Sequence, residues 1–354
     1  SPFQVLSAIE AKHFYGFENN ILLVKYTVRK ERKRNRDQIF KAVELDDWDS
    51  VIVWRTGIGF WKTKALVDYL QFRRIGIQLK SKCEVLFLGE FRCASMHRMR
   101  SLLKPVQTVI LDDGAASIWI QRDYLLQGKF KYQGTAFLKR RSNLGRLLYN
   151  RYDTDPILEN RLRMFTCFPN PVAVNEGVTS VCNFRFLRNR LRLIKCKQNA
   201  VFYFGSKYSE RGIICRQYEL LFLQEVYAYY RYSAKTREIY YVSHRDDSPE
   251  KVRAIEKLGF IIKEYEETAE VAMIKEVNRP ARIGSAYSAV MSTLPILFPQ
   301  LTFDSFVIPL ENVAQEYREG VRSAYEFYES RGISLLDWVD GQFVERTSVS
   351  ESAE

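Results

Sequence analysis

The chain has 354 residues, of which 46% are hydrophobic and 27% are charged, and this balance is typical of a folded globular protein rather than a disordered one. Its 54 lysine and arginine residues outnumber its 42 acidic residues, for a net charge of +12, so we expect an anionic partner. No stretch approaches the roughly 20 apolar residues of a membrane-spanning helix, and we expect no signal peptide at the start.

The six cysteines lie far apart, without the close pairs that zinc or redox sites require. We therefore expect reduced, mostly buried thiols in a cytoplasmic protein. Basic residues gather at 28–36, 138–146 and 184–197. Such clusters are typical either of solvated faces or of peripheral contact with an anionic membrane surface.

The first half of the chain alternates short apolar runs with amphipathic stretches. The apolar runs predict strands that are buried on both faces, at 21–28, 50–54, 84–89 and 108–112. Helical spacing of apolar residues appears between them, as at 60–74 and 94–104. This alternation predicts a parallel, doubly wound α/β sheet.

A second alternation follows a looser stretch rich in proline and asparagine. It predicts strands at 200–205, 238–243 and 302–308 and helices at 217–232, 248–259 and 312–332. In the helix at 248–259, a serine is the cap, a proline follows it and a glycine ends it.

The chain is therefore expected to form two α/β domains. We place the first domain at 1–165, a connector at 166–198 and the second domain at 199–310. The remaining residues, 311–354, are expected to form a helix and tail that pack back on the first domain. In such sheets, ligands bind beyond the carboxyl ends of the strands, so polar residues at those ends are candidate site residues.

Asp112, Asp113 and Gly114 follow the strand at 108–112 directly. Adjacent side chains of an extended backbone point to opposite sides, so the two aspartates are expected to have different roles. One orients the loop together with Gly114, and the other, Asp113, faces the ligand. The alternative is an ordinary Asp-Gly turn with no chemistry attached.

Two segments of the second domain are also candidate phosphate sites. His244 and Arg245 follow a strand and are suited to hold a phosphate by charge-assisted hydrogen bonds. The segment from Gly284 and Ser285 to Tyr287 and Ser288 precedes a helix start, where free backbone N–H groups favour a phosphate. The alternatives are a surface histidine and a plain serine cap.

Gly205 and Ser206 form a further strand-to-loop turn, after the strand at 200–205, that is suited to approach a nucleotide or a sugar. The signal of these two residues alone is weak, because many strands end in such a turn.

Four motifs in this order, "SPFQVLSAIEA", "DDG", "YYVSHR" and "GSAYSAVMSTL", resemble bacterial sialyltransferases of the GT-B type, namely the lipooligosaccharide sialyltransferase and capsule polysialyltransferase families. The resemblance implies two Rossmann-like domains facing a cleft, with an acceptor-side first domain and a nucleotide-sugar donor domain. It also implies that a strand precedes the opening segment. Arg245 and Tyr287 depart from the family pattern, in which a proline and a serine stand at these places.

The resemblance further implies metal-independent, inverting transfer of sialic acid from CMP-sialic acid to a hydroxyl of a bacterial surface glycan, as in lipopolysaccharide or capsule biosynthesis, with no cofactor. Asp113 would then be the general base, and His244 would stabilise the departing phosphate. Donor contacts would come from Gly205, Ser206, His244, Arg245, Gly284, Ser285, Tyr287 and Ser288.

Two alternatives remain open at this point. The same fold and mechanism would serve another CMP-activated sugar, such as pseudaminic acid, another nonulosonic acid or Kdo. A basic, non-enzymatic nucleic-acid-binding protein would also suit the charge. We disfavour a nucleic-acid partner, because the aromatic residues lie within apolar runs rather than on an exposed basic face.

Overall fold

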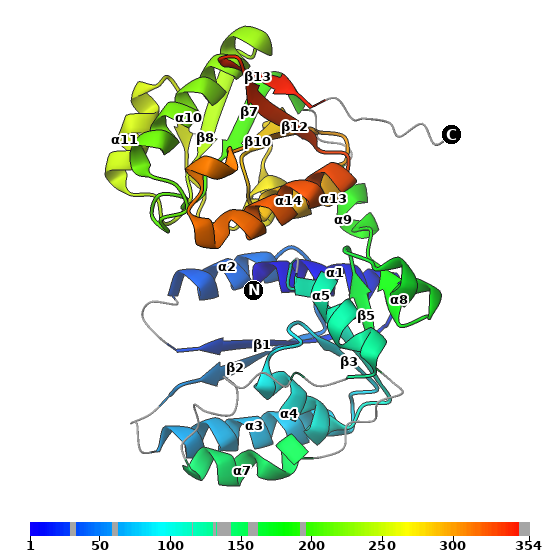
Figure 1. The fold of residues 1–354 in the computed structure, drawn as a ribbon. Helices are drawn as coiled ribbons and strands as arrows, with labels where there is room; N and C mark the ends of the chain where they lie inside the picture. Colours follow the sequence, from blue (N-terminus) through cyan, green and yellow to red (C-terminus); the bar gives the residue numbers. More distant parts are fainter. Residues whose placement is uncertain are drawn as a thin grey trace. The chain divides into compact units, whose positions relative to one another are not determined.

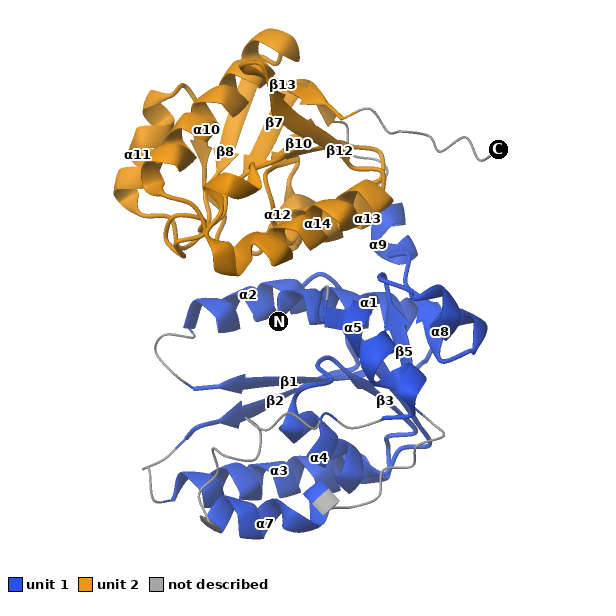
Figure 2. Cartoon of the chain, viewed as in Figure 1, with its two compact units in different colours: residues 1–189 blue, residues 190–354 orange. Residues whose placement is uncertain are grey.

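The computed structural model describes residues 1–28, 33–58, 63–114, 116–129, 132, 143–154, 162–191 and 196–346. The chain divides into two compact units, residues 1–189 and 190–354 (Figure 2). Each unit is an α/β structure built on parallel strands, so the predicted α/β class with two Rossmann-like domains is confirmed.

Unit 1 contains two parallel sheets with helices on both faces (Figure 1). One sheet pairs β1 (Ile21–Thr27) with β2 (Ser50–Thr56). The other has the order β3 (Val85–Leu88), β4 (Gln107–Leu111), β5 (Leu162–Thr166) and β6 (Thr179–Val181). The helical segments are α1 (Pro2–Tyr15), α2 (Lys33–Val43), α3 (Lys64–Lys80), α4 (Ala94–Leu103), α5 (Ala116–Asp123), the 3₁₀ turn η2 (Leu125–Gln127), α7 (Asn143–Thr154), α8 (Pro171–Asn175) and α9 (Arg185–Leu191).

Unit 2 is built on one seven-stranded sheet with the order β13-β12-β11-β10-β7-β8-β9. Its strands are β7 (Cys196–Phe204), β8 (Glu238–Val242), β9 (Ile261–Lys263), β10 (Arg279–Ser285), β11 (Thr302–Phe306), β12 (Ser334–Val339) and β13 (Gln342–Glu345). All neighbours are parallel except β12 and β13. Numbered from β7, the six parallel strands have the order 3-2-1-4-5-6 of doubly wound nucleotide-binding sheets.

The helices of unit 2 connect these strands. They are α10 (Arg216–Ala228) with the π-helical turn η4 (Tyr229–Ser233), α11 (Pro249–Lys257), α12 (Ala269–Lys275), α13 (Val290–Leu297), the 3₁₀ turns η5 (Leu310–Asn312) and η6 (Gln315–Tyr317), and α14 (Arg318–Ser330). Helix α11 starts as its sequence predicts: the Ser248 hydroxyl accepts a hydrogen bond from the Lys251 N–H, and Pro249 takes the first position.

The predicted boundaries need two corrections. The expected connector, 166–198, includes α8 and β6, and β6 pairs with β5 in the sheet of unit 1. Its Asn-Pro dipeptide is a helix start rather than a loop, because Asn170 caps α8 and Pro171 takes the first position. The expected tail, 311–354, belongs to unit 2, where β12 extends the sheet from β11 and forms a hairpin with β13.

Candidate functional site

Asp112, at the carboxyl end of β4, is fully buried. Its Oδ1 accepts hydrogen bonds from the hydroxyls of Ser117 and Thr166, and its Oδ2 accepts one from the N–H of Cys167, at 2.7 Å. Burial raises the pKa of Asp112, although these hydrogen bonds oppose the shift. Asp112 thus ties the loop after β4 to the loop after β5, which is a positioning role.

Asp113 points away from these contacts, as expected for adjacent residues of an extended strand end. Its side chain is 20% exposed. Its Oδ1 accepts hydrogen bonds from Gln4 Nε2 at 2.7 Å and Ser1 Oγ at 3.0 Å, and Arg92 donates to Oδ2 at 3.1 Å. The next residue, Gly114, has φ +81°, a conformation that favours glycine and turns the chain into the following loop.

Glu90, just beyond the end of β3, completes this group. Arg92 donates to both of its carboxylate oxygens, at 2.8 and 2.7 Å. Burial acts to raise the Glu90 pKa, but hydrogen bonds from Arg92 and Asp113 outweigh it and hold the pKa at about 2. Burial, together with the hydrogen bond and charge of Glu90, raises the Asp113 pKa to about 6. Two neighbouring carboxyl groups therefore titrate far apart, an arrangement typical of acid–base sites.

Sequence reasoning found Asp113 but missed Glu90, Arg92 and Gln4. The available signal was the acid in "FLGEFR", directly after the predicted strand 84–89. β3 and β4 are parallel neighbours, so their carboxyl ends meet at one edge and bring Glu90 and Asp113 together.

His244 follows β8 in unit 2 and is half-buried, whereas Arg245 is exposed. The His244 Nδ1 accepts a hydrogen bond from the backbone N–H of Asp246 at 3.1 Å, and the backbone N–H of His244 donates to Asp247 Oδ2 at 2.8 Å. An accepting Nδ1 is unprotonated, and burial lowers the His244 pKa. The imidazole is thus neutral, with Nε2–H available as a donor.

The glycines of the predicted donor motifs are required by packing. A Cβ on Gly205 would lie 2.1 Å from the hydroxyl of Tyr241, and one on Gly284 would lie 2.1 Å from the hydroxyl of Tyr230. Ser285 is fully buried, and its hydroxyl donates to the Phe204 carbonyl at 2.9 Å. These contacts link the central strands of the sheet and do not by themselves indicate a ligand.

Two tyrosine hydroxyls hold the segment between β10 and α13. Tyr208 accepts from the N–H of Tyr287 at 2.8 Å and donates to its carbonyl at 2.7 Å. Tyr328 of α14 does the same at Ser288, at 3.0 and 2.7 Å. A phosphate at this helix start would have to displace both hydroxyls, so the donor role of Tyr287 and Ser288 stays a prediction.

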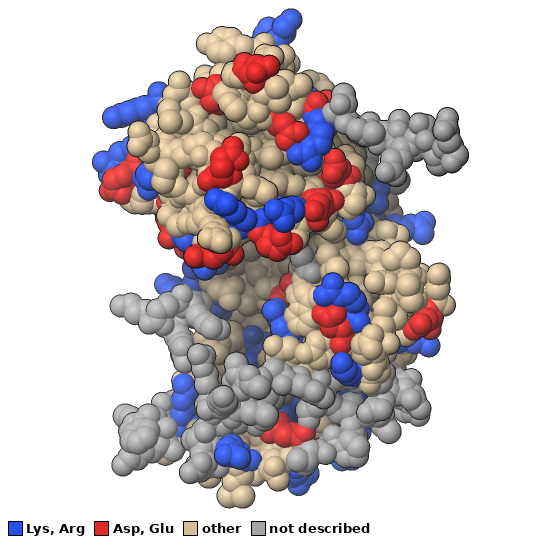
Figure 3. Space-filling view, viewed as in Figure 1, with Lys and Arg blue, Asp and Glu red and all other residues tan. Residues whose placement is uncertain are grey.

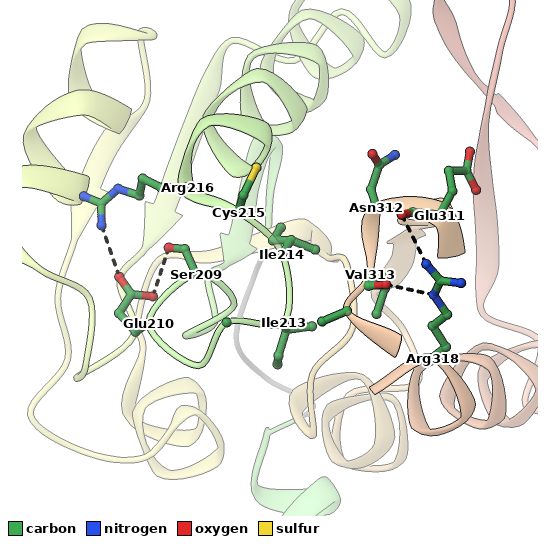
Figure 4. Close-up of a pocket in the computed structure, with 12 residues that line it drawn as sticks. Ser209, Glu210, Ile213, Ile214, Cys215, Arg216, Glu311, Asn312, Val313 and Arg318 are labelled. Carbon is green, nitrogen blue, oxygen red and sulfur yellow. Dashed lines mark hydrogen bonds and ion pairs between the residues drawn. The ribbon is translucent and has the colours of Figure 1, made fainter. Parts of the chain in front are cut away.

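A cavity of about 630 Å³ lies at the carboxyl edge of the unit 2 sheet, between the loop after β7 and the segment after β11 (Figure 4). The lining residues are Ser209, Glu210, Gly212, Ile213, Ile214, Cys215, Arg216, Glu311, Asn312, Val313, Ala314 and Arg318. Arg216 contacts Glu210 on one side, and Arg318 donates to the Val313 carbonyl at 2.9 Å on the other. The cavity therefore combines an apolar wall with two cations.

Lys251 of α11 stabilises one wall of this cavity from behind. Its side chain is fully buried, and Nζ lies 2.5 Å from Glu219, 2.9 Å from Asp247 and 3.2 Å from Glu210. It also donates to the Ser206 carbonyl at 2.9 Å. Burial acts to lower the Lys251 pKa, but the charges of Glu219 and Asp247 raise it more, so the lysine stays charged. Sequence reasoning missed this cluster, because a lysine in an amphipathic helix is usually solvated.

Within the described residues, no group of three or more histidine, cysteine or acidic residues could hold a metal ion. None of the described helices has both the length and the apolar character that crossing a bilayer demands. All six cysteines are free, but the expected burial is wrong for most of them: only Cys167 and Cys182 are buried, three are partly exposed, and Cys215 is exposed. On the face of unit 2 that Figure 3 shows, basic and acidic side chains are interspersed. The predicted basic clusters lie partly outside the described residues, at 29–32, 138–142 and 192–195, and membrane contact stays a prediction.

No family model and no curated protein matches the chain. Solved structures do match. A UDP-GlcNAc 2-epimerase from Methanocaldococcus jannaschii shares 11% identity at a TM-score of 0.39, over 86% of this chain and 92% of that chain. A putative UDP-N-acetylglucosamine 2-epimerase from Listeria monocytogenes shares 10% identity at a TM-score of 0.43, over 86% of this chain and 82% of that chain.

These findings overturn the expected membership in the bacterial sialyltransferases. The solved structures that match are UDP-GlcNAc 2-epimerases, so the prediction of a sialyltransferase that uses CMP-sialic acid is corrected. The residues that suggested the resemblance make local contacts that many α/β sheets could share: Asp112 ties two loops together, as expected, Gly205 and Gly284 pack on tyrosines, and Ser285 bridges strands. Such short motifs do not by themselves identify a family. At TM-scores below 0.5, the likeness itself carries no argument about the activity of this chain.

Proposed function

We propose that the chain is an enzyme that acts on a nucleotide-activated sugar, with Asp113 as the general base. The observation that carries the proposal is the pair of carboxyl groups at the ends of β3 and β4. A pKa of about 6 leaves Asp113 mostly ionised at neutral pH and basic enough to take a proton. Glu90, with a pKa of about 2, stays ionised and keeps the Asp113 pKa raised.

Arg92 and Gln4 are positioning residues in this proposal. Each donates to Asp113, Arg92 at Oδ2 and Gln4 at Oδ1. Together they fix the carboxylate plane, while the 20% exposure of the side chain leaves it open to a substrate. A fixed, partly buried base loses little free energy to reorganisation when the proton moves.

We assign binding of the nucleotide part of the substrate to unit 2. The cavity beyond β7 and β11 has the size of small-ligand pockets. Ile213, Ile214 and Val313 offer apolar contact to a base, and the guanidinium groups of Arg216 and Arg318 suit a phosphate. The 3-2-1-4-5-6 strand order supports this assignment, because such sheets bind nucleotides beyond their carboxyl ends.

We assign His244 the role of a hydrogen-bond donor at the same carboxyl edge of the unit 2 sheet. Its neutral imidazole offers the Nε2 proton to an anionic oxygen, without the cost of burying a second full charge. The exposed Arg245 is left as a secondary phosphate contact. Both roles are part of the proposal.

The decisive experiment incubates the purified chain with sugars activated by different nucleotides, in H₂O and in D₂O, and analyses the products by mass spectrometry. We expect turnover of at least one of them. Deuterium carried into a carbon-bound position of the sugar shows that the proton was taken from carbon. Conversion without deuterium leaves two sources, a hydroxyl or a carbon that receives the same proton back, and the mass of the product separates a transferred group from a rearranged sugar. Asp113→Asn should reduce the rate by at least ~100-fold.

Asp123→Asn is the matched control, because Asp123 pairs with Arg122 on the surface of the same unit. It should keep the wild-type rate. Turnover of no nucleotide sugar by the wild-type chain, or a wild-type rate for Asp113→Asn, would contradict the proposal.

Nucleotide binding is tested separately by calorimetry with nucleoside monophosphates and diphosphates. Arg216→Ala should weaken binding by roughly 10-fold, the effect of losing one charge-assisted hydrogen bond. Arg322→Ala, at an exposed arginine that pairs with Glu319, should leave it unchanged. Equal affinities for these two variants would contradict nucleotide binding in this cavity. The proposed role of Asp113 would be unchanged.

A further inference from the structure

Helix α3 is apolar on two opposite sides. Its inner side packs in the core of unit 1, where Phe72, Ile75 and Leu79 are buried. Its outer side exposes three further large apolar residues, which share one face because they are spaced four and seven residues apart: Leu66, Leu70 and Ile77. A surface helix of a folded protein needs only one apolar face, so the core does not account for the outer one.

Helix α7 lies beside α3 and extends this apolar surface (Figure 1). Arg73, which stands between Leu70 and Ile77 on the outer side of α3, donates to the Tyr152 hydroxyl of α7 at 2.6 Å. Leu144 lies two helical turns before Tyr152, on the same side of α7. The outer sides of the two helices therefore adjoin, and we call them together the α3–α7 face. Its exposed apolar residues are Leu66, Leu70, Ile77, Leu144 and Leu147.

The exposed charged side chains of these two helices are all basic. They are Arg74, Lys80, Arg146 and Arg151. Among the residues that the structure describes, none of the four forms an ion pair with a carboxylate. The acidic residues of the helices are engaged elsewhere, because Asp68 accepts from the Gly57 N–H at 2.8 Å and Asp153 accepts from Arg98 at 2.9 Å. The α3–α7 face thus combines apolar side chains with cations that are available to an anionic partner.

An anionic lipid bilayer fits both properties of this face. Leucine and isoleucine side chains are stabilised when they leave water for the boundary between headgroups and acyl chains. Arginine and lysine side chains have long stems that let their charges reach the lipid phosphates.

Two other partners fit the α3–α7 face less well. A symmetric contact with a second copy of the chain would bring two basic surfaces together. A nucleic acid would offer the leucines little apolar contact unless its bases stacked on exposed rings. The aromatic residues of α3 and α7 are buried or half-buried, so they offer no such platform.

We propose that the α3–α7 face binds the surface of an anionic membrane. The two helices lie along the interface, with the five apolar side chains among the headgroups and the basic side chains on the phosphates. Of the residues in the predicted basic clusters, only Arg146 belongs to this face. The proposal stands on the surface of unit 1 and does not depend on the proposed activity.

The test measures binding of the purified 354-residue chain to lipid vesicles by flotation. One set of vesicles is phosphatidylcholine with about one third phosphatidylglycerol, and the other is phosphatidylcholine alone. We expect binding to the anionic vesicles to be at least ~10-fold stronger than to the neutral ones, and to weaken as salt is added.

An apolar double variant, Leu70→Gln with Leu147→Gln, tests the contact with the headgroups. We expect it to weaken binding to anionic vesicles by at least ~10-fold, because two side chains no longer gain from leaving water. Its thermal unfolding should match that of the wild type, since both side chains are exposed. The matched control is Leu221→Gln with Val277→Gln in unit 2, because all four residues are more than half exposed. This control should bind as the wild type does.

The charges are tested one at a time. Arg74→Gln and Arg146→Gln should each weaken binding to anionic vesicles by about 5-fold, the effect of one cation near a charged membrane surface. Arg322→Gln in unit 2 removes the same charge from an exposed position and should leave binding unchanged.

Equal vesicle binding by the wild type and the Leu70→Gln, Leu147→Gln variant would overturn the proposal. So would a dimer in sedimentation analysis that this variant abolishes, since the face would then belong to a second copy. Binding of RNA at this face more tightly than vesicles would also overturn it. Flotation uses no substrate, so failure of the proposed function leaves this test unaffected.

Discussion

The two units use acidic residues at the carboxyl edges of their sheets in opposite ways. In unit 2, Glu210, Glu219 and Asp247 all pair with the fully buried Lys251, and burial raises the Glu219 pKa despite this pairing. In unit 1, Glu90 and Asp113 share Arg92, and Asp113 keeps a raised pKa of about 6. The comparison teaches that a buried cation shared by several carboxylates ties the loops of unit 2 together, whereas in unit 1 a carboxyl group with a raised pKa stays partly exposed.

The largest expected effect is on the stability of unit 2. Lys251→Met leaves three carboxylates without their shared cation, two of them almost completely buried. We expect a loss of about 3–5 kcal/mol in the free energy of unfolding, measured by denaturant titration. Lys257→Met, at an exposed position of the same helix, is the control and should change stability little.

Adding Glu219→Gln to Lys251→Met sharpens this prediction. It removes one of the uncompensated charges, so part of the lost stability should return. A Lys251→Met protein as stable as the wild type would show that the cluster has no structural role and would break the contrast between the units.

An intermediate effect is expected at the centre of the unit 2 sheet. Gly205→Ala introduces a Cβ that would lie 2.1 Å from the buried hydroxyl of Tyr241. We expect about 1–3 kcal/mol of destabilisation, the usual result of overpacking, measured by thermal unfolding. Gly320→Ala in α14, where a Cβ meets nothing within 4 Å, should be neutral or slightly stabilising. If Gly205→Ala is as stable as the wild type, packing does not explain this glycine, and a ligand contact becomes the better explanation.

The smallest effect is a shift in the pH dependence of the reaction. Asp113 acts as a base only when ionised, so kcat/KM should fall as the pH drops through about 6. Glu90 raises the Asp113 pKa, so Glu90→Gln should move this fall to lower pH. Glu84→Gln, at a residue that precedes β3, is a control for general charge effects. If kcat/KM falls at the same pH in the wild type and in Glu90→Gln, Glu90 does not set the pKa of Asp113.

Much of the fold could be predicted from the sequence, because buried parallel strands appear as short apolar runs and helices as spaced apolar residues. β4 and β8 lie where the pattern placed them, each within one or two residues. β12 was missed because its strand follows a long amphipathic helix, and a C-terminal tail was the simpler interpretation. The missed β6 has only three residues, too few for a periodic signal.

The candidate site was predictable only where one residue carried the signal alone. Asp113 stood out because two acids and a glycine end a strand. The role of Glu90 depends on the pairing of β3 with β4, which no local pattern encodes. The four-residue charge cluster around Lys251 joins α10, α11 and two loops, so it also exists only in three dimensions.

The tyrosine hydroxyls at Tyr287 and Ser288 have a consequence for selectivity. A ligand that reaches either amide exchanges an existing hydrogen bond for a new one of similar strength, so each exchange contributes only a fraction of the ~1 kcal/mol of a net hydrogen bond. Any discrimination between ligands at this edge of unit 2 would therefore come from shape and from charge, because the backbone amides of Tyr287 and Ser288 would favour no ligand strongly.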